Sequence, residues 1–202
     1  MDADALQPLS LAAALAWAAG LRVYGVVFAV GLLGHFGWVE LPGGLRALAH
    51  PAVDGVSGLL FLLEFFADKV PVIDSLWDAF NTFVRIPAGA ALAAMALADR
   101  DPGWVIAAAL VGGVLAGGTH AAKMGTRAAI NLSPEPFSNW AASFTEDGMA
   151  AGILALAILH PLWVRAALAV FVVLLVWLLP KLIGAALRAM RAGFGRLRGG
   201  PA

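Results

Sequence analysis

The sequence predicts an all-α integral membrane protein, a polytopic bundle of about six transmembrane helices. Hydrophobic residues make up 61% of the 202 residues and charged residues only 13%, whereas about half of a soluble domain is apolar. Mean hydropathy is accordingly high, at +0.87. The apolar residues form blocks of roughly 18 to 30, the length at which a helix crosses a hydrocarbon core of about 30 Å. The helices are expected at residues 9–39, 53–68, 75–98, 104–130, 138–159 and 162–190.

The first predicted helix carries an interruption. Gly20 and Arg22 stand near its middle. Because a flexible residue there adjoins a charge that lipid would not tolerate, we expect the helix to break at this point. Residues 41–51 follow with two glycines and two prolines, a composition typical of an interfacial connection. The second helix starts after this connection.

The third predicted helix begins beside Asp74 or Ser75, either of which can cap its N-terminus. Pro87 is expected to kink it. Residues 99–103 are the most polar connection in the chain and separate it from the fourth helix. Small residues that would let a neighbouring helix approach closely lie on the fourth and fifth helices, at Gly113, Gly117, Gly148 and Gly152.

Prolines mark the start of the last two predicted helices. Pro134 and Pro136 prevent their segment from being helical throughout, and Ser138 can cap the fifth helix. The sixth helix begins after Pro161 and leads to a basic tail at residues 191–202. Under the positive-inside rule this tail is cytoplasmic, and six crossings put the N-terminus there too. The acidic N-terminus is unlike that of a signal peptide, so the first helix is expected to be retained.

One transmembrane domain is expected over residues 1–202, and two patterns suggest an internal repeat. The first is an inverted 3+3 repeat with halves at residues 5–99 and 104–190, because an odd number of crossings reverses the second copy. The second is a shift of 63 positions. The residues that match are Gly20 and Arg22 with Gly125 and Arg127 in the first pattern, and Ser75 with Ser138 and Trp77 with Trp140 in the second.

Charged residues recur at helical spacing inside the predicted spans. His120, Lys123 and Arg127 stand at i, i+3 and i+7, on one face of the fourth helix. Polar residues follow similar spacing on the second, third and fifth helices. A charge in the middle of a span costs roughly 2.5 to 3.5 kcal/mol, so such residues persist when paired, hydrated or functional. We therefore predict a polar centre made by Arg22, Glu64, Asp68, Asp78, Arg85, His120, Lys123, Arg127, Asn139 and Glu146.

The charges of this region admit two interpretations. One is a structural network of ion pairs that fixes how the helices dock, with its outermost members, Lys69, Asp74 and Asn131, in the headgroup region. The other is a hydrated site or pathway, because buried ion pairs stabilise a fold poorly. The numbers nearly balance, at six acids and five bases: Glu64, Asp68, Asp74, Asp78, Glu146 and Asp147 against Arg22, Lys69, Arg85, Lys123 and Arg127.

Several other functions are disfavoured. The chain has no cysteine and a formal net charge of zero, so thiolate chemistry is excluded and nucleic acid is not an expected partner. The four histidines show no metal-ligand spacing. No nucleophile elbow, phosphate loop or dinucleotide fingerprint is present. We therefore expect no metal, no cofactor and no enzymatic activity.

Several segments rich in polar residues together resemble an uncharacterised bacterial family, domain of unknown function 4126. They are AGLRVY (residues 19–24), LEFFADKVP (63–71), DSLWD (74–78), TFVRIPAGA (82–90) and SPEPFSN (133–139). The resemblance implies a multi-pass protein of the bacterial inner membrane. It implies no substrate.

The leading hypothesis is a small transporter or channel-like protein whose polar centre moves a small ion or anionic solute. Glu64 and Glu146 are the candidates for proton coupling, and the basic residues would hold an anionic group. One alternative is a lipid-handling protein that recognises a phosphorylated headgroup. Another is a scaffold with structural ion pairs. Membrane lipids are expected partners, and a homo-oligomer is left open.

Overall fold

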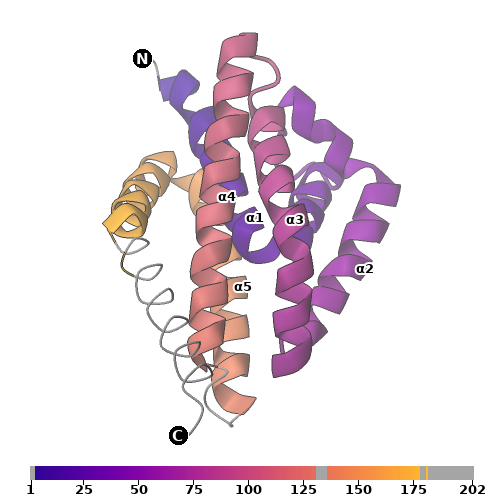
Figure 1. Ribbon diagram of the computed structural model, residues 1–202. Helices are drawn as coiled ribbons and strands as arrows, with labels where there is room; N and C mark the ends of the chain where they lie inside the picture. The colour runs from indigo at the N-terminus through magenta and orange to yellow at the C-terminus, as the bar shows by residue number, and fades with distance from the viewer. Residues whose placement is uncertain (1–2, 131–135, 178–180, 182–202) are drawn as a thin grey trace, which may run out of the picture. The chain divides into compact units, whose positions relative to one another are not determined.

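The computed structural model describes residues 3–130, 136–177 and 181, and every regular element in them is helical (Figure 1). The all-α prediction is confirmed for this part of the chain. The elements are α1 (Ala3–His35), the 3-10 helix η1 (Gly43–Ala49), α2 (Pro51–Ala67), α3 (Pro71–Ala96), α4 (Pro102–Ile130), α5 (Pro136–Leu159) and a last helix, Pro161–Trp177.

The chain divides into two compact units, residues 1–165 and 166–202. The first unit contains α1 to α5. In the second, residues 166–177 continue the last helix, and the Lys181 ammonium lies 3.2 Å from the centre of the Trp177 ring. The basic tail at 191–202 and the connection at 131–135 lie outside the described residues, so the expectations for them stay predictions.

The middle of α1 is a sharp break. Arg22 has non-helical backbone angles (φ −144°, ψ 71°), which confirms the predicted interruption. Gln7 and Leu33 line the same cavity, yet a straight helix would separate them by about 39 Å. The two halves of α1 therefore return to one level, as Figure 1 shows. Although Gln7–His35 is long and apolar enough to cross a membrane, the helix folds back on itself at Arg22.

Prolines start α3 and α5 earlier than predicted. The predicted caps at Ser75 and Ser138 lie inside the helices, because α3 begins at Pro71 and α5 at Pro136. A proline suits the first turn, where its missing N–H would have no helical partner. α3 then continues through Pro87 as one helix.

α3 and α4 approach each other closely at a glycine that the sequence did not single out. A Cβ at Gly112 would overlap the Ala93 side chain and the Gly89 carbonyl oxygen. Gly113 and Gly117 make ordinary contacts instead, and Gly148 and Gly152 meet no neighbour among the described residues. Small residues do bring two helices together, but one position away from the predicted pair.

Two ends of the helical bundle can be distinguished. One is the end where α3 begins at Pro71, and α4 ends and α5 begins there too. We call it the Pro71 end. The opposite end, where residues 97–101 join α3 to α4, is the Asp99 end. There the Gly43 amide donates to Asp99 Oδ2 at 2.8 Å, which places η1 at the Asp99 end.

Polar side chains are buried and apolar ones exposed on the same helices. In α3, Asp78, Asn81 and Arg85 are at most 2% exposed, whereas Phe80 and Phe83 are 65% and 82% exposed. This arrangement suits lipid outside and polar groups inside. Among the described residues, four helices are long and apolar enough to span a membrane, and η1 with α2 adds a fifth if the bent pair counts as one. A multi-pass membrane protein is supported; six crossings and an inverted repeat stay predictions.

Candidate functional site

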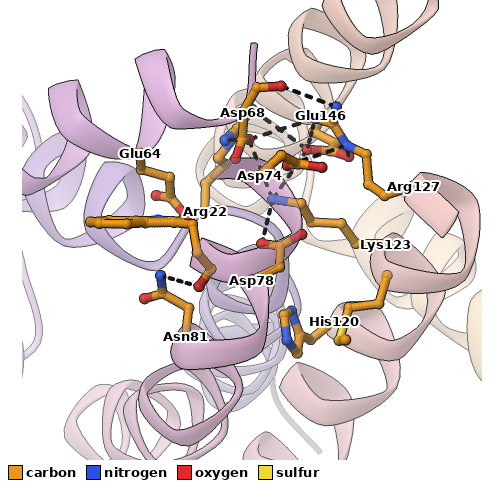
Figure 2. Close-up of polar contacts among 12 residues, drawn as sticks. Arg22, Glu64, Asp68, Asp74, Asp78, Asn81, His120, Lys123, Arg127 and Glu146 are labelled. Atoms are coloured by element: carbon orange, nitrogen blue, oxygen red, sulfur yellow. Dashed lines mark hydrogen bonds and ion pairs between the residues drawn. The ribbon is translucent and has the colours of Figure 1, made fainter. Parts of the chain in front are cut away.

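The ten residues predicted to form a polar centre are linked by ion pairs and hydrogen bonds near the Pro71 end, and Figure 2 labels all of them but Arg85 and Asn139. None of them is more than 7% exposed. We call this set, together with Asp74, the charged centre. Its members come from the break in α1, the end of α2, the start and middle of α3, the second half of α4 and the first half of α5: Arg22, Glu64, Asp68, Asp74, Asp78, Arg85, His120, Lys123, Arg127, Asn139 and Glu146.

Helical periodicity explains why these side chains converge. Asp74, Asp78 and Arg85 are spaced so that they share one face of α3, and His120, Lys123 and Arg127 share one face of α4. Since α3 and α4 are antiparallel neighbours, the two polar faces can meet. The break in α1 then brings the Arg22 guanidinium next to these two faces.

Arg22 joins three elements at that break. Its guanidinium forms an ion pair with Asp68 and lies 2.7 Å from Asp147 Oδ1 through Nε. Nη2 donates to the carbonyl oxygen and the hydroxyl of Ser143, at 3.2 and 3.0 Å. The turn in α1 is therefore fixed by contacts to the end of α2 and to α5.

Arg127 ties the end of α4 to α5. Its Nε and Nη2 donate to the two oxygens of Glu146 at 2.9 and 3.0 Å, the two-point geometry that makes arginine–carboxylate pairs strong. Nη1 donates to the backbone and side-chain oxygens of Asn139, both at 3.1 Å. This arginine is fully engaged with protein groups.

Lys123 lies in the middle of the acids. Its ammonium is 3.3 Å from Asp68 Oδ2, 3.0 Å from Asp78 Oδ1 and 3.4 Å from Glu146 Oε2. Figure 2 shows dashed lines running from this nitrogen to the surrounding carboxylates. One cation thus bridges the end of α2, α3 and α5.

Arg85 and His120 form the inner edge of the charged centre. Arg85 pairs with Glu64 and lies 2.8 Å from Asp78 Oδ1 and 2.8 Å from His120 Nδ1. Arginine only donates hydrogen bonds, so Nδ1 must accept and the ring proton lies on Nε2. Nε2 then donates to the Thr82 hydroxyl at 2.8 Å, and that hydroxyl donates to the Asp78 carbonyl oxygen. His120 is therefore neutral in this network.

Asp74 differs from its neighbours. It is fully buried. Neither carboxylate oxygen has a hydrogen-bond partner among the described residues, and the same is true of Asp78, but Asp78 lies 2.8 Å from Arg85 and 3.0 Å from Lys123. The nearest cationic atom to Asp74 is Arg127 Nε, at 3.9 Å from Oδ1, and that nitrogen already donates to Glu146. Asp74 is the carboxylate with the least compensation.

Lys69 does not join the charged centre, although the sequence counted it among the five bases. Its ammonium lies 3.1 Å from the centre of the Phe65 ring and donates to the Phe65 carbonyl oxygen at 3.0 Å. Partial burial lowers the pKa of Lys69, and the Asp147 carboxylate opposes that shift. With Lys69 apart from the charged centre, the six acids counted from the sequence face four basic side chains instead of five.

The charged centre holds more negative than positive groups. Among the described residues it contains five buried carboxylates and four buried cationic side chains. Asp147, with a 23% exposed side chain, adds a sixth carboxylate beside Arg22. The acids are Glu64, Asp68, Asp74, Asp78 and Glu146, and the cations are Arg22, Arg85, Lys123 and Arg127.

Three of these acids lie close enough to meet one cation. Oxygens of Asp68, Asp74 and Asp78 lie within 4.8 Å of one another. The Lys123 ammonium, however, is already within 3.3 Å of two of them. A divalent metal ion at this point would face that positive charge, so the residues fit a metal ion poorly.

The predicted set of ten omitted Asp74, Ser143 and Asp147, which all belong to or contact the charged centre. Spacing could have added Asp74, which stands four residues before Asp78. Asp147 directly follows Glu146 in the sequence. No local signal identifies Ser143 as an Arg22 partner, because its contact depends on where α1 breaks.

The comparison with protein families gave one match. A family model described as a domain of unknown function (DUF4126) matches residues 9–181. Neither a curated protein nor a solved structure matches the chain. The matched range includes the whole charged centre, and nothing in it indicates an enzymatic activity.

Proposed function

The chain belongs to the DUF4126 family, whose function is unknown, and we propose that it is a membrane transport protein that moves protons or another small cation through its charged centre. The coarser statement, a multi-pass membrane protein, follows from its helices. Transport, the ion and the inner membrane as location are the proposed part.

The excess of buried carboxylate carries this proposal. Taking a charge out of water costs several kcal/mol unless a partner compensates it, and the surroundings here are a bilayer rather than water. With more acids than cations, the charged centre needs at least one further positive charge, a proton or a small cation. A group that gains and loses such a charge is what a transport site requires.

Asp74 is the residue we expect to take up that charge. Glu64 and Glu146, the candidates suggested by the sequence, are both paired with arginine. The nearest cationic atom to Asp74 among the described residues is 3.9 Å away, so a proton on Asp74 weakens ion pairing less than a proton on Glu64 or Glu146 would. The ion pairs among the other residues of the charged centre would then remain whether or not Asp74 carries the proton.

An anionic substrate is less well supported than the sequence suggested. Each of the four buried cations already contacts at least one carboxylate. An incoming anion would have to displace these acids. A scaffold with structural ion pairs only is also less favoured, because such a network would pair Asp74.

The broken α1 supports a transport role and affects the expected topology. Irregular backbone at membrane depth is tolerated where it lines a cavity or is buried in protein, and transporters place such breaks beside their substrates. If both ends of α1 lie on the same side of the membrane, α1 does not cross it. α2 to α5 and the last helix, if each spans the membrane, then make an odd number of crossings. Labelling of cysteines introduced at positions 2 and 195 distinguishes this from six crossings with both termini cytoplasmic.

The decisive experiment measures ion flux. The purified protein is reconstituted into liposomes that enclose a pH-sensitive dye, and a potassium diffusion potential drives proton entry. We expect flux above that of empty liposomes, and its loss in Asp74→Asn. Asp101→Asn, a change in the exposed connection between α3 and α4, is the matched control and keeps full flux.

Two outcomes would overturn the proposal. One is a parent protein that moves neither protons nor sodium nor potassium ions. The other is a folded Asp74→Asn variant with the flux of the parent. Either result would favour the structural interpretation of the charged centre.

A further inference from the structure

A second region of the protein, at the Asp99 end, contains a cavity of about 600 Å³. Its volume lies in the range typical of small-ligand sites. Both halves of α1 contribute to it, together with η1, the end of α3 and the end of α5. It shares no residue with the charged centre.

The inner wall of this cavity is apolar. Leu45, Ala96, Leu154 and Ala157 line it and are each at most 7% exposed. Polar ligands gain nothing from such a wall, whereas an acyl chain is removed from water there at roughly 25 cal/mol per Å². The depth of the cavity therefore favours a hydrocarbon segment.

The rim of the cavity is charged and exposed. It carries two carboxylates and two guanidinium groups, from Glu40, Arg46, Asp99 and Arg100. Arg46 Nε donates to the Leu41 carbonyl oxygen at 3.4 Å, and its two terminal nitrogens have no partner among the described residues. Guanidinium groups suit phosphate, and carboxylates suit an ammonium group.

We propose that this cavity binds a phospholipid with a zwitterionic headgroup. Its phosphate contacts Arg46 and Arg100, its ammonium contacts Glu40 and Asp99, and one acyl chain lies against the apolar wall. The balance of two acids and two arginines selects a headgroup that carries both charges over one that is only anionic. Because both halves of α1 line the cavity, the lipid also fixes the spacing of the hairpin whose break holds Arg22.

Native mass spectrometry of the delipidated full-length protein in detergent tests this proposal. The probes are phosphatidylethanolamine, phosphatidylglycerol and diacylglycerol with identical acyl chains. We expect one phosphatidylethanolamine to bind, with affinity about tenfold above that of the other two, the difference expected for one charge-assisted contact to the headgroup.

Variants assign the bound lipid to the cavity. Arg46→Gln changes an exposed side chain, so the protein stays folded, and we expect it to weaken phosphatidylethanolamine binding about tenfold. Ala157→Phe fills the apolar wall and should abolish binding. Arg165→Gln removes an arginine outside the cavity lining and should leave binding unchanged, as should Asp74→Asn in the charged centre.

The results that would overturn the proposal are clear. Equal affinity for the three lipids would indicate non-specific solvation of the apolar surface. Unchanged binding in Arg46→Gln would show that the headgroup does not contact Arg46. Absence of any bound lipid would show that the cavity is not a lipid site. None of these outcomes depends on ion flux, so the proposed transport function is tested separately.

Discussion

The charged centre at the Pro71 end and the cavity at the Asp99 end contain the same kinds of side chain in opposite surroundings. In the charged centre, arginines and acids are buried and contact one another. At the cavity, similar groups stand exposed around an apolar hollow. Residue type alone therefore does not decide the role of a charge in this protein; its burial and its partners do.

The difference has an energetic consequence. Removing one partner of a buried ion pair leaves a charge uncompensated and costs about 3–5 kcal/mol. An exposed pair contributes about 0–1 kcal/mol, because water solvates both groups. The same substitution should thus be severe in one region and mild in the other.

The largest effect is expected for Arg127→Ala. This residue is 2% exposed and holds Glu146 by two hydrogen bonds, so loss of its side chain should lower the free energy of unfolding by about 3–5 kcal/mol. Arg46→Ala at the cavity rim is the control, with an expected loss below about 1 kcal/mol. Thermal unfolding in detergent measures both. Equal melting temperatures would break the comparison.

A double variant sharpens this result. Glu146→Ala combined with Arg127→Ala removes both partners of this ion pair, so neither partner is left as a buried charge without the other. Part of the lost stability should therefore return. Additive losses in the double variant would mean that the two residues do not act as a pair.

A medium effect is expected at the close contact between α3 and α4, outside both regions. In Gly112→Ala the new methyl group would overlap Ala93 and the Gly89 carbonyl oxygen, and we expect a loss of about 1–3 kcal/mol. Gly148→Ala meets no described neighbour and should gain up to about 1 kcal/mol, since alanine favours helix. Chemical denaturation of both variants tests this. A stable Gly112→Ala protein would mean that α3 and α4 can move apart freely.

A smaller effect is expected for Asp74→Asn. Because the nearest cationic atom to Asp74 among the described residues is 3.9 Å away, the loss of its charge should change the unfolding free energy by less than about 1 kcal/mol. Asp78 lies 2.8 Å from Arg85 and 3.0 Å from Lys123, so Asp78→Asn should cost about 1.5–3 kcal/mol. Melting temperatures that fall equally for the two would show that Asp74 is a structural member of the network.

The smallest effect is expected for Asp99→Asn. Its Oδ2 accepts from the Gly43 amide at 2.8 Å, and an asparagine oxygen can do the same. The residue is exposed, so we expect a change within about 0.5 kcal/mol. Melting curves at low and high salt check it. A loss as large as that of Asp78→Asn would remove the distinction between buried centre and exposed rim.

The sequence alone determined that the helices of this protein suit a membrane and which residues share a face of each helix. Composition and block length predict membrane helices because crossing a bilayer requires long apolar segments. Periodicity predicted that His120, Lys123 and Arg127 share a face, since the geometry of a helix is local. The break at Arg22 was visible for the same reason, as a charge and a glycine in an apolar run.

The tertiary structure decided which of these features meet. The sequence could mark a break in α1 but not its angle, which depends on contacts of Arg22 with Asp68 and Ser143 far along the chain. Other features also depend on contacts between distant segments. They are the burial of Asp74, the separation of Lys69 from the charged centre, and the cavity, whose lining residues range from Gln7 to Ile158 in the sequence. Local pattern fixes what each helix face is, whereas packing between helices fixes what it touches.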